Sequence, residues 1–360
     1  MANKNTLHAA LDAVRHVTDP EPPWQDIIDS ASVLVGADAG LVLMFSTDRE
    51  LLFMEQRHID SHAVQEYREH THAQDAIRDA AFDSAAGTWT VSTQILSQPE
   101  RQKHPFYDYL HRHRIGEIRS LTLQHGAHSR AAMTFHRSAP LRRTATAASQ
   151  MEIAEYSRAL ISAVSERQRI AALHFEAIDS ALLSLDEAAC LVTPAGRILQ
   201  ASEVATSLLR GARMIDASGL CITHLQPAIH HGLRHALRQA AQGASHVSYA
   251  APVSWGHALR LDISVAPPVY RVGGETVLFV RLASRTTFAT PDPDCLARFF
   301  GITHAEARVL AALVAGHSAT DHAAMTGTAE RTVRNQIASL LKKMNCNRQA
   351  ELVRLASLMM

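Results

Sequence analysis

A group of side chains near the carboxyl end of the sequence has the types and spacing to contact a nucleic acid. Arg331, Arg334, Asn335, Ala338 and Lys342 follow one another at i, i+3, i+4, i+7 and i+11, which places them on one face of a helix. Arginine can donate two hydrogen bonds to guanine, asparagine can pair with adenine, and alanine can contact the methyl group of thymine. This face therefore suits the major groove of double-stranded DNA.

The rest of the same segment supports this interpretation. Thr332, Lys342 and Lys343 are spaced to contact phosphates, which position a helix on DNA without reading the sequence. The opposite face is apolar and must pack inward; it consists of Val333, Ile337, Leu340, Leu341 and Met344. We predict a helix over residues 329–345 that reads DNA through its polar face. A solvated basic surface on a helical bundle is the alternative that the charge pattern alone leaves open.

Local signals predict two shorter helices before this one. Thr303 and Glu306 have the spacing of a capping box, and Gly316 is placed to end the helix that they begin. Ser318 is expected to cap the next helix, and Gly327 supplies the turn after it. The basic helix is thus expected as the third of a small group.

Residues 302–356 resemble the LuxR-type helix-turn-helix of bacterial transcription regulators, with the spacing kept throughout. The matching elements are Thr303 with Glu306, Gly316-His317-Ser318, Thr332-Val333-Arg334-Asn335, and Arg348-Gln349-Ala350-Glu351-Leu352-Val353. The resemblance implies an all-α domain of four helices and a homodimer on paired DNA half-sites. It also implies a cytoplasmic transcription regulator that contacts RNA polymerase.

Three positions depart from the family pattern. His322 stands where the second helix usually has isoleucine, Ala329 replaces the serine that usually caps the recognition helix, and Asn345 replaces a glycine. Asparagine tolerates the left-handed backbone conformation, and Thr328 is a candidate to replace the missing cap. His322 and Ala329 leave open a second function, that of a protein-interaction adaptor whose helices do not bind DNA.

Composition and charge agree with a nucleic-acid partner at one end of the chain. The 360 residues suffice for two or three domains, and 47% apolar with 19% charged residues is typical of a globular protein. From Cys295 onward, eight basic and four acidic residues give a charge of +4, and the balanced total leaves −4 on the preceding part. A basic segment beside a mildly acidic body fits this expectation.

The sequence indicates no enzyme, no metal site and no cofactor. We find no phosphate-binding loop, nucleophile elbow or zinc-protease motif. His231 and His235 lie at i, i+4, but a third metal ligand is not evident. The four cysteines form no C-x-x-C pair, so reduced thiols are expected. No signal peptide or membrane-spanning stretch is recognised, so we expect a cytoplasmic protein with no membrane partner.

The fold class that we expect is α+β. Two antiparallel-sheet sensor domains joined by a long helix would precede the helical DNA-binding domain. In the second of them, helices are expected on one face of the sheet. The expected boundaries are 1–140 for the first domain, 141–174 for the connecting helix, 175–283 for the second domain, 284–294 for a linker, and 295–360 for the DNA-binding domain.

Stretches of both front domains resemble sensor domains. Residues 67–78, 87–90 and 105–116 resemble a GAF- or PAS-like domain, and residues 190–209 resemble a PAS domain. Such a domain encloses a cavity that holds a small-molecule effector or only side chains. Ser202 stands where the PAS pattern often has asparagine.

Tyr67 and Asp75 are the candidate ligand-binding residues of the first domain. A tyrosine eight residues before an aspartate is a feature of acyl-homoserine-lactone receptors, so a quorum-sensing receptor is a further alternative. In that family proline usually follows the aspartate, whereas this sequence has Ala76. The other interpretation places Tyr67 at the edge of the core and Asp75 at the surface or at a helix cap.

Periodicity and turn residues predict the helices of the front part. Ser61 is expected to cap a helix with one face made of Val64, Tyr67, Thr71, Gln74, Ile77 and Ala81. A further helix is predicted over residues 99–113. Residues 144–172 contain neither glycine nor proline and predict the long connecting helix, which either pairs with its copy in a dimer or packs on its neighbours.

Overall fold

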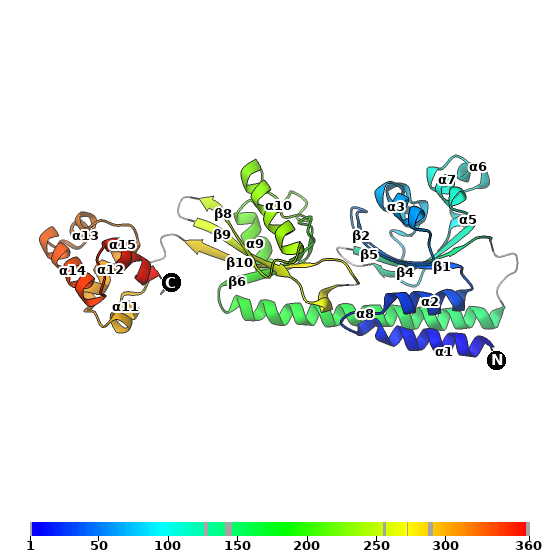
Figure 1. Cartoon of the computed structure of the whole chain (residues 1–360), viewed down its shortest axis with the longest axis horizontal. Coiled ribbons are helices and arrows are strands. Elements are labelled where there is room, and N and C mark those ends of the chain that lie inside the picture. The colour runs from blue at the N-terminus through cyan, green and yellow to red at the C-terminus, as the bar shows by residue number, and fades with distance from the viewer. Residues whose placement is uncertain are drawn as a thin grey trace. The chain divides into compact units, whose positions relative to one another are not determined.

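The computed structural model describes residues 2–125, 129–140, 146–254, 257–271, 273–286 and 291–357. They form two compact units. The first holds residues 1–209, 214–249 and 262–281, and the second holds residues 282–360 with the short segments 210–213 and 250–261. The first unit contains an antiparallel five-stranded sheet, a long helix and most of a second five-stranded sheet, while the second contains the C-terminal helices (Figure 1).

The first sheet has the strand order β2-β1-β5-β4-β3. Its strands are β1 (Ala39–Ser46), β2 (Leu51–Arg57), β3 (Trp89–Val91), β4 (Glu117–His125) and β5 (Ser129–Arg137). Every residue of β1, an inner strand of the sheet, is buried, because helices cover both faces of the sheet. This strand is an uninterrupted apolar run, which is the pattern expected for a strand that meets no solvent.

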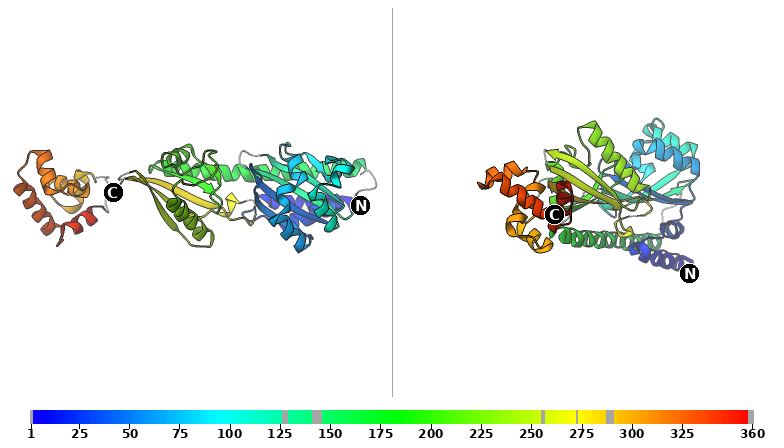
Figure 2. Two further views of the ribbon diagram at one scale, coloured as in Figure 1. Left: turned by 90° about the horizontal axis from the view of Figure 1, so that it is seen from above. Right: turned by 60° about the vertical axis from the view of Figure 1, so that its left-hand side comes forward.

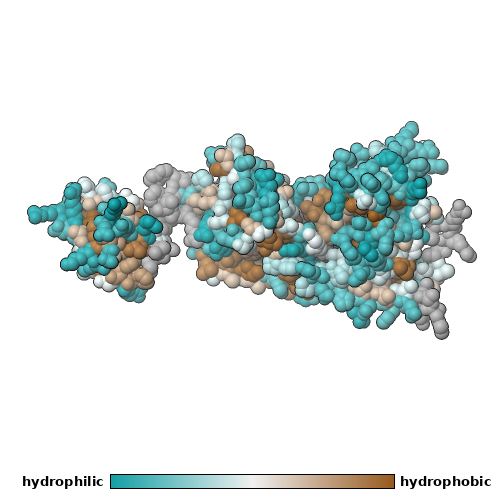
Figure 3. All heavy atoms as spheres, in the orientation of Figure 1, coloured by the Kyte–Doolittle hydropathy of each residue, from teal (hydrophilic) through white to brown (hydrophobic). Residues whose placement is uncertain are grey.

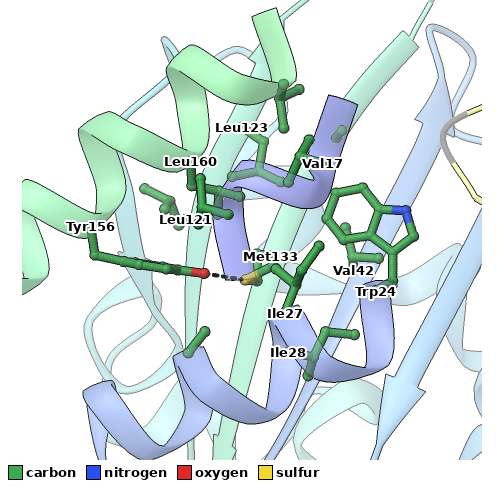
Figure 4. Close-up of a cluster of buried hydrophobic side chains, with 14 of the residues drawn as sticks. Val17, Trp24, Ile27, Ile28, Val42, Leu121, Leu123, Met133, Tyr156 and Leu160 are labelled. Atoms are coloured by element: carbon green, nitrogen blue, oxygen red, sulfur yellow. Dashed lines mark hydrogen bonds between the residues drawn. The ribbon is translucent and has the colours of Figure 1, made fainter. Parts of the chain in front are cut away.

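One face of this sheet packs on α2 (Trp24–Val35) and α8 (Ala147–Leu183), and α1 (Ala2–Arg15) and η1 (His16–Thr18) pack on these helices. The core between them contains Trp24, Ile27, Val42, Leu121, Leu123 and Leu160, among others (Figure 4). Tyr156 of α8 is fully buried there, and its hydroxyl lies 3.6 Å from the Met133 sulfur. The long helix is therefore part of the first domain's core.

The other face is covered by short helical segments. They are α3 (Ser61–Glu69), η2 (Thr71–Gln74), α4 (Ala76–Ala81), α5 (Ser92–Ile95), α6 (Gln98–Arg101) and α7 (Pro105–Arg112). Figure 3 shows that the outer surface over α3, α6 and α7 is mostly hydrophilic. Beneath these helices lies a second apolar cluster that includes Leu43, Phe45, Tyr67, Phe106 and Tyr109.

Two of the predicted helices are wrong in their extent. The segment 61–81 is not one helix, because Asp75 starts a new one by accepting the amides of Ile77 and Arg78, at 2.8 and 3.1 Å. Its first part is capped by Asp60 rather than Ser61. The predicted helix over residues 99–113 is divided before Pro105, since proline lacks an amide proton and disfavours helical geometry in the preceding residue.

The connecting helix is longer than predicted. α8 begins after the cap Thr146 and continues to Leu183, nine residues beyond the expected end of the connector at 174. Its second half packs Phe175 and Leu182 against Ala189 and Leu191 of the second sheet. The helix runs past both sheets (Figures 1 and 2).

The second sheet has the order β7-β6-β10-β9-β8. Its strands are β6 (Glu187–Val192), β7 (Ile198–Ala201), β8 (Val247–Ser254), β9 (His257–Val265) and β10 (Leu278–Thr286), with α9 (Glu203–Gly211), α10 (Pro227–Ala241) and η3 (Pro268–Tyr270) between them. β6 is buried throughout, with α8 on one side and α9 and α10 facing the other (Figure 1). The expectation of helices on one face only is therefore wrong.

The C-terminal helices are α11 (Pro293–Phe300), α12 (His304–Val314), α13 (Ala319–Thr326), α14 (Glu330–Lys343) and α15 (Gln349–Ala356). They share a small core around Leu296, Leu310, Val333, Leu340 and Leu352. The last four are the helices expected from the sequence, and α11 begins within the segment predicted as a linker. β10 enters that segment from the other side, since it extends to Thr286.

Candidate functional site

Helix α14 has one buried face and one exposed face. Val333, Leu340 and Met344 are buried, and Ile337 and Leu341 pack partly buried against the same core, so the predicted inward face is confirmed. All seven side chains predicted to contact DNA are exposed: Arg331, Thr332, Arg334, Asn335, Ala338, Lys342 and Lys343. Their contacts with DNA stay a prediction.

Side-chain caps fix the starts of α12 and α13, the two helices that precede α14. The predicted capping box of Thr303 and Glu306 has both of its hydrogen bonds. The predicted cap Ser318 also forms a box, in which Asp321 supplies the second hydrogen bond. Gly327 has a φ of +65°, a left-handed conformation that suits glycine, and it ends α13. α14 itself starts at Ala329 without a side-chain cap, so the suggestion that Thr328 replaces the serine is wrong. The start of α14 lacks a stabilising contact that caps usually supply.

Glu306 ties α12 to α14. Its carboxylate accepts hydrogen bonds from Lys343 Nζ at 2.8 Å and Ser339 Oγ at 2.6 Å, both on α14, as well as from Thr303. Burial disfavours the charged form of Glu306 and by itself raises the pKa of this carboxyl group. The hydrogen bonds together have the larger effect and lower the pKa of Glu306 to about 2. The sequence identified Glu306 only as part of a cap.

An ion pair lies along the exposed face of α14. Arg334 contacts Glu330, one turn earlier, with Nη2 at 2.6 Å and Nε at 3.0 Å from the same carboxylate oxygen. The Arg334 side chain is 71% exposed, so the pair is solvated and easily exchanged for another acceptor. In the structure Arg334, which we expect to read a base, lies along the helix and is paired with Glu330. Binding to a base would require Arg334 to exchange this partner.

The departures from the family pattern are accommodated differently. Asn345 has a φ of +51°, so it adopts the left-handed conformation that was expected of it. His322 is buried in α13, and its pKa is lowered by burial and by the nearby charges of Arg308 and His317. A neutral imidazole therefore occupies the position at which the family pattern has isoleucine.

A cavity of about 70 Å³ lies in the first domain, between the first sheet and the helices α3, α4 and α7. Its lining is mostly apolar, with Leu41, Leu43, Met54, Ile77 and Phe106 among the residues. Apolar lining with a few polar groups is typical of small-molecule sites, although such sites usually measure about 300–1,000 Å³. The cavity as it stands admits only a small occupant.

Both predicted ligand-binding residues line this cavity. Tyr67 donates its hydroxyl to Asp75 at 2.6 Å, and both residues are buried. Burial and the neighbouring Asp75 raise the pKa of Tyr67, and burial raises the pKa of Asp75 against the effect of its hydrogen bonds. Asp75 also caps α4, which is one of the two places that the other interpretation gave it, and it is buried rather than at the surface.

Several polar residues of the cavity were missed by sequence reasoning. Ser120 and Thr134 share a hydrogen bond of 3.0 Å across β4 and β5. Thr122 Oγ1 is buried and has no hydrogen-bond partner in the described structure. His136 is buried, and burial lowers its pKa to about 4. In β4 and β5 these polar residues alternate with apolar ones, and this alternation was the sequence signal that could have identified them. It does not show which face of the sheet is covered by helices.

Among the described residues, no three His, Cys, Asp or Glu side chains are grouped so as to hold a metal ion. The described helices include none with the length and apolar character needed to span a membrane. His231 and His235 lie on α10 without a third ligand in that part of the structure.

The C-terminal helices match a known family. Residues 301–356 match the family described as bacterial regulatory proteins, luxR family. This range contains the helices α12 to α15 and all of the residues predicted to contact DNA. Comparison of the sequence with curated proteins finds no match.

Solved structures give distant likenesses. The LBD domain of VqsR from Pseudomonas aeruginosa has a TM-score of 0.34 and 14% identity, covering 46% of this chain and 97% of that one. CepR2 from Burkholderia cenocepacia, an N-acylhomoserine lactone dependent LuxR family transcription factor, has 0.33 and 13%, covering 46% and 93%. SdiA from Escherichia coli has 0.29 and 8%, covering 91% and 86%. These likenesses are too distant to assign a ligand to this chain.

Proposed function

We propose that the chain regulates transcription by reading specific DNA sequences with α14, because residues 301–356 match the luxR family of bacterial regulatory proteins. The observation that carries this proposal is the division of α14 into an apolar face held in the core and an exposed face with every predicted contact residue. Arg331, Arg334 and Asn335 read base edges, and Lys342 contacts phosphate. Lys343 reaches a phosphate only by leaving Glu306 or by sharing its ammonium protons with both.

Selection of bound fragments from random DNA tests this function. The full chain is expected to enrich a short motif, with two half-sites if the protein binds as a homodimer. A variant with Arg334→Ala and Asn335→Ala is expected to lose that motif. Arg308→Ala, at an exposed arginine on α12 outside the proposed reading face, serves as the matched control. Enrichment of the same motif by both variants would refute the assignment of α14.

The adaptor alternative is supported by the uncapped start of α14 and by the buried His322. Both features weaken a small domain, but neither occupies the exposed face. An adaptor of this kind would enrich no DNA motif in the selection. The same experiment therefore separates the two functions.

A small effector in the first domain is the second part of the proposal. The unpartnered Thr122 hydroxyl and the neutral His136 line a mostly apolar cavity, in which Tyr67, Asp75, Ser120 and Thr134 are already hydrogen-bonded to one another in pairs. This lining favours an uncharged, largely apolar molecule with a hydrogen-bonding group. Small alcohols and the carboxylates of the same size are suitable probes in thermal-shift measurements. Stabilisation by the alcohols alone, reduced in Thr122→Val, is expected, and equal shifts with both classes would contradict it.

We also propose that the protein forms a homodimer, contacts RNA polymerase and is located in the cytoplasm. They follow from the role of a regulator that binds DNA in a bacterial cell. An acyl-homoserine lactone is not proposed as the effector, since its acyl chain would require a larger cavity than the present one. No catalytic activity is assigned.

A further inference from the structure

Arg167 lies in the middle of α8 with its guanidinium buried. All of its hydrogen-bond acceptors in the described structure are main-chain carbonyl oxygens. Nη1 donates to Val17 at 3.1 Å and to Asp19. Nη2 donates to Pro20 at 3.0 Å, to Pro268 at 3.2 Å and to Arg271 at 2.7 Å. Nε donates to Arg271 at 3.0 Å. A single side chain thus satisfies five carbonyl groups.

These carbonyls belong to two segments that are far apart in the sequence. Val17, Asp19 and Pro20 form the connection between α1 and α2 of the first domain. Pro268 and Arg271 lie in the connection that leads from β9 to β10 of the second domain and contains η3. α8 packs against both η1 and η3. Arg167 is therefore the point at which a piece of each front domain is held against the same helix.

Arginine is better suited than lysine to bind this group of carbonyl oxygens. Its planar guanidinium offers five N–H donors in a fixed arrangement, whereas a lysine ammonium offers three and is more strongly hydrated. Burial lowers the pKa of Arg167, and the nearby charges of Glu275 and Asp19 oppose the shift. If either segment left the helix, Arg167 donors and buried carbonyls would lose their partners, which is costly away from water.

Two further contacts join the same domains. Gly273 lies so close to Phe53 of β2 that a Cβ atom there would be 2.2 Å from the ring. Arg197, just before β7, donates to Asp48 at 2.6 Å and to Glu50 at 3.1 Å in the turn between β1 and β2. The strands β1 and β2 also line the cavity through Phe45 and Met54. The contacts thus connect the cavity's own strands with the second sheet.

We propose that Arg167 couples the two front domains, so that the segment of the first domain and the segment of the second can detach from α8 only together. A change in the domain that contains the cavity then reaches the second sheet through this junction and through the turn that holds Arg197. The coupling acts whether or not the cavity binds an effector.

Hydrogen exchange of the full chain, measured by mass spectrometry, tests the coupling. The amides of Asp19 and Arg271 report on the two segments, since each donates within its own turn, at 3.2 and 3.0 Å. Arg167→Met keeps the apolar stem and removes the donors. We expect exchange in residues 16–21 and in residues 267–271 to accelerate together, by at least about tenfold. Arg169→Met is the control, because Arg169 is exposed on the same helix and its hydrogen bonds in the described residues go to Glu166.

Two other variants keep the test decisive if Arg167→Met does not fold. Arg167→Lys should accelerate both segments less than Arg167→Met. Gly273→Ala disturbs the junction from the other side by pushing against Phe53, and it should accelerate the same two segments. Acceleration confined to one segment, or equal effects of Arg167→Met and Arg169→Met, would overturn the proposal.

Discussion

Lys343 Nζ lies 2.8 Å from the carboxylate of Glu306, and this contact ties the last turn of α14 to the first turn of α12. The same carboxylate accepts the Ser339 hydroxyl and caps α12 through Thr303. The orientation of α14 is therefore fixed at its carboxyl-terminal end. At its amino-terminal end, Ala329 supplies no side-chain cap. The half of the helix that carries Arg331 and Arg334 is the half with fewer local constraints.

Glu306→Gln should destabilise the C-terminal helices. The substitution removes a buried charge that Lys343 and Ser339 were arranged to satisfy, so a loss of about 1–3 kcal/mol in the free energy of opening α14 is expected. Hydrogen exchange of the α14 amides measures this quantity. Glu330→Gln is the control, because its pair with Arg334 is exposed and should contribute less than about 1 kcal/mol. Equal losses in both variants would contradict the role given to Glu306.

Arg334→Ala and Lys342→Ala should differ in kind. Loss of the arginine is expected to relax base preference at one position of the selected motif, at a cost of about 1–3 kcal/mol for the preferred base. Loss of the lysine should weaken binding to all sequences alike. Titrating each variant against the selected duplex and against single-base variants of it measures both effects. Indistinguishable profiles would refute the orientation of α14 in the groove.

Tyr67→Phe should destabilise the first domain by about 1–3 kcal/mol. It removes the hydrogen bond to the buried Asp75 carboxyl, which is left with fewer partners. Tyr109→Phe is the control, since its hydroxyl donates to the neutral carbonyl of Ala63 at 3.1 Å and should matter less. Urea unfolding followed by tryptophan fluorescence reports on this domain through Trp24 and Trp89. A smaller effect for Tyr67 than for Tyr109 would contradict the importance of the pair.

Acidification should destabilise the first domain through His136. Burial lowers the pKa of His136 to about 4, whereas the unfolded chain has the ordinary value of 6.5. The unfolded state therefore binds a proton first as the pH falls. The stabilising contribution is complete above pH 6.5 and is lost as the pH falls from 6.5 to about 4, and the total loss is about 3 kcal/mol.

His136→Gln is expected to flatten this dependence, and His62→Gln, at an exposed position, is expected to leave it unchanged. The urea midpoints of the wild type and of both variants, measured between pH 7 and pH 4.5, test this expectation. A wild-type slope retained in His136→Gln would assign the acid sensitivity to other groups.

The C-terminal helices could be predicted from the sequence because their signals are local. Capping boxes at Thr303 and Ser318, the glycine at 327 and the apolar period of α14 each depend on residues within one or two turns. The tie between Glu306 and Lys343 could not be predicted in the same way. It spans two helices, and its geometry depends on how they pack.

The cavity could be predicted only in part. The spacing of Tyr67 and Asp75 indicated a pair, and the structure joins them. Thr122 and His136 were missed, because alternation in a strand shows that two faces differ but not that helices cover both. Asp75 was also expected inside one continuous helix, whereas its carboxylate interrupts the segment and starts α4. A side chain that competes for backbone amides outweighed the periodic pattern there.

Binding of the selected duplex by the full chain across a series of salt concentrations tests the central claim most directly. If the exposed face of α14 lies in the major groove with its lysines at phosphates, the logarithm of the binding constant must fall linearly with the logarithm of salt concentration, by about 0.9 for each phosphate neutralised. Lys342→Ala should reduce that slope by about one. Binding that does not change with salt, or no detectable binding at low salt, would contradict the account.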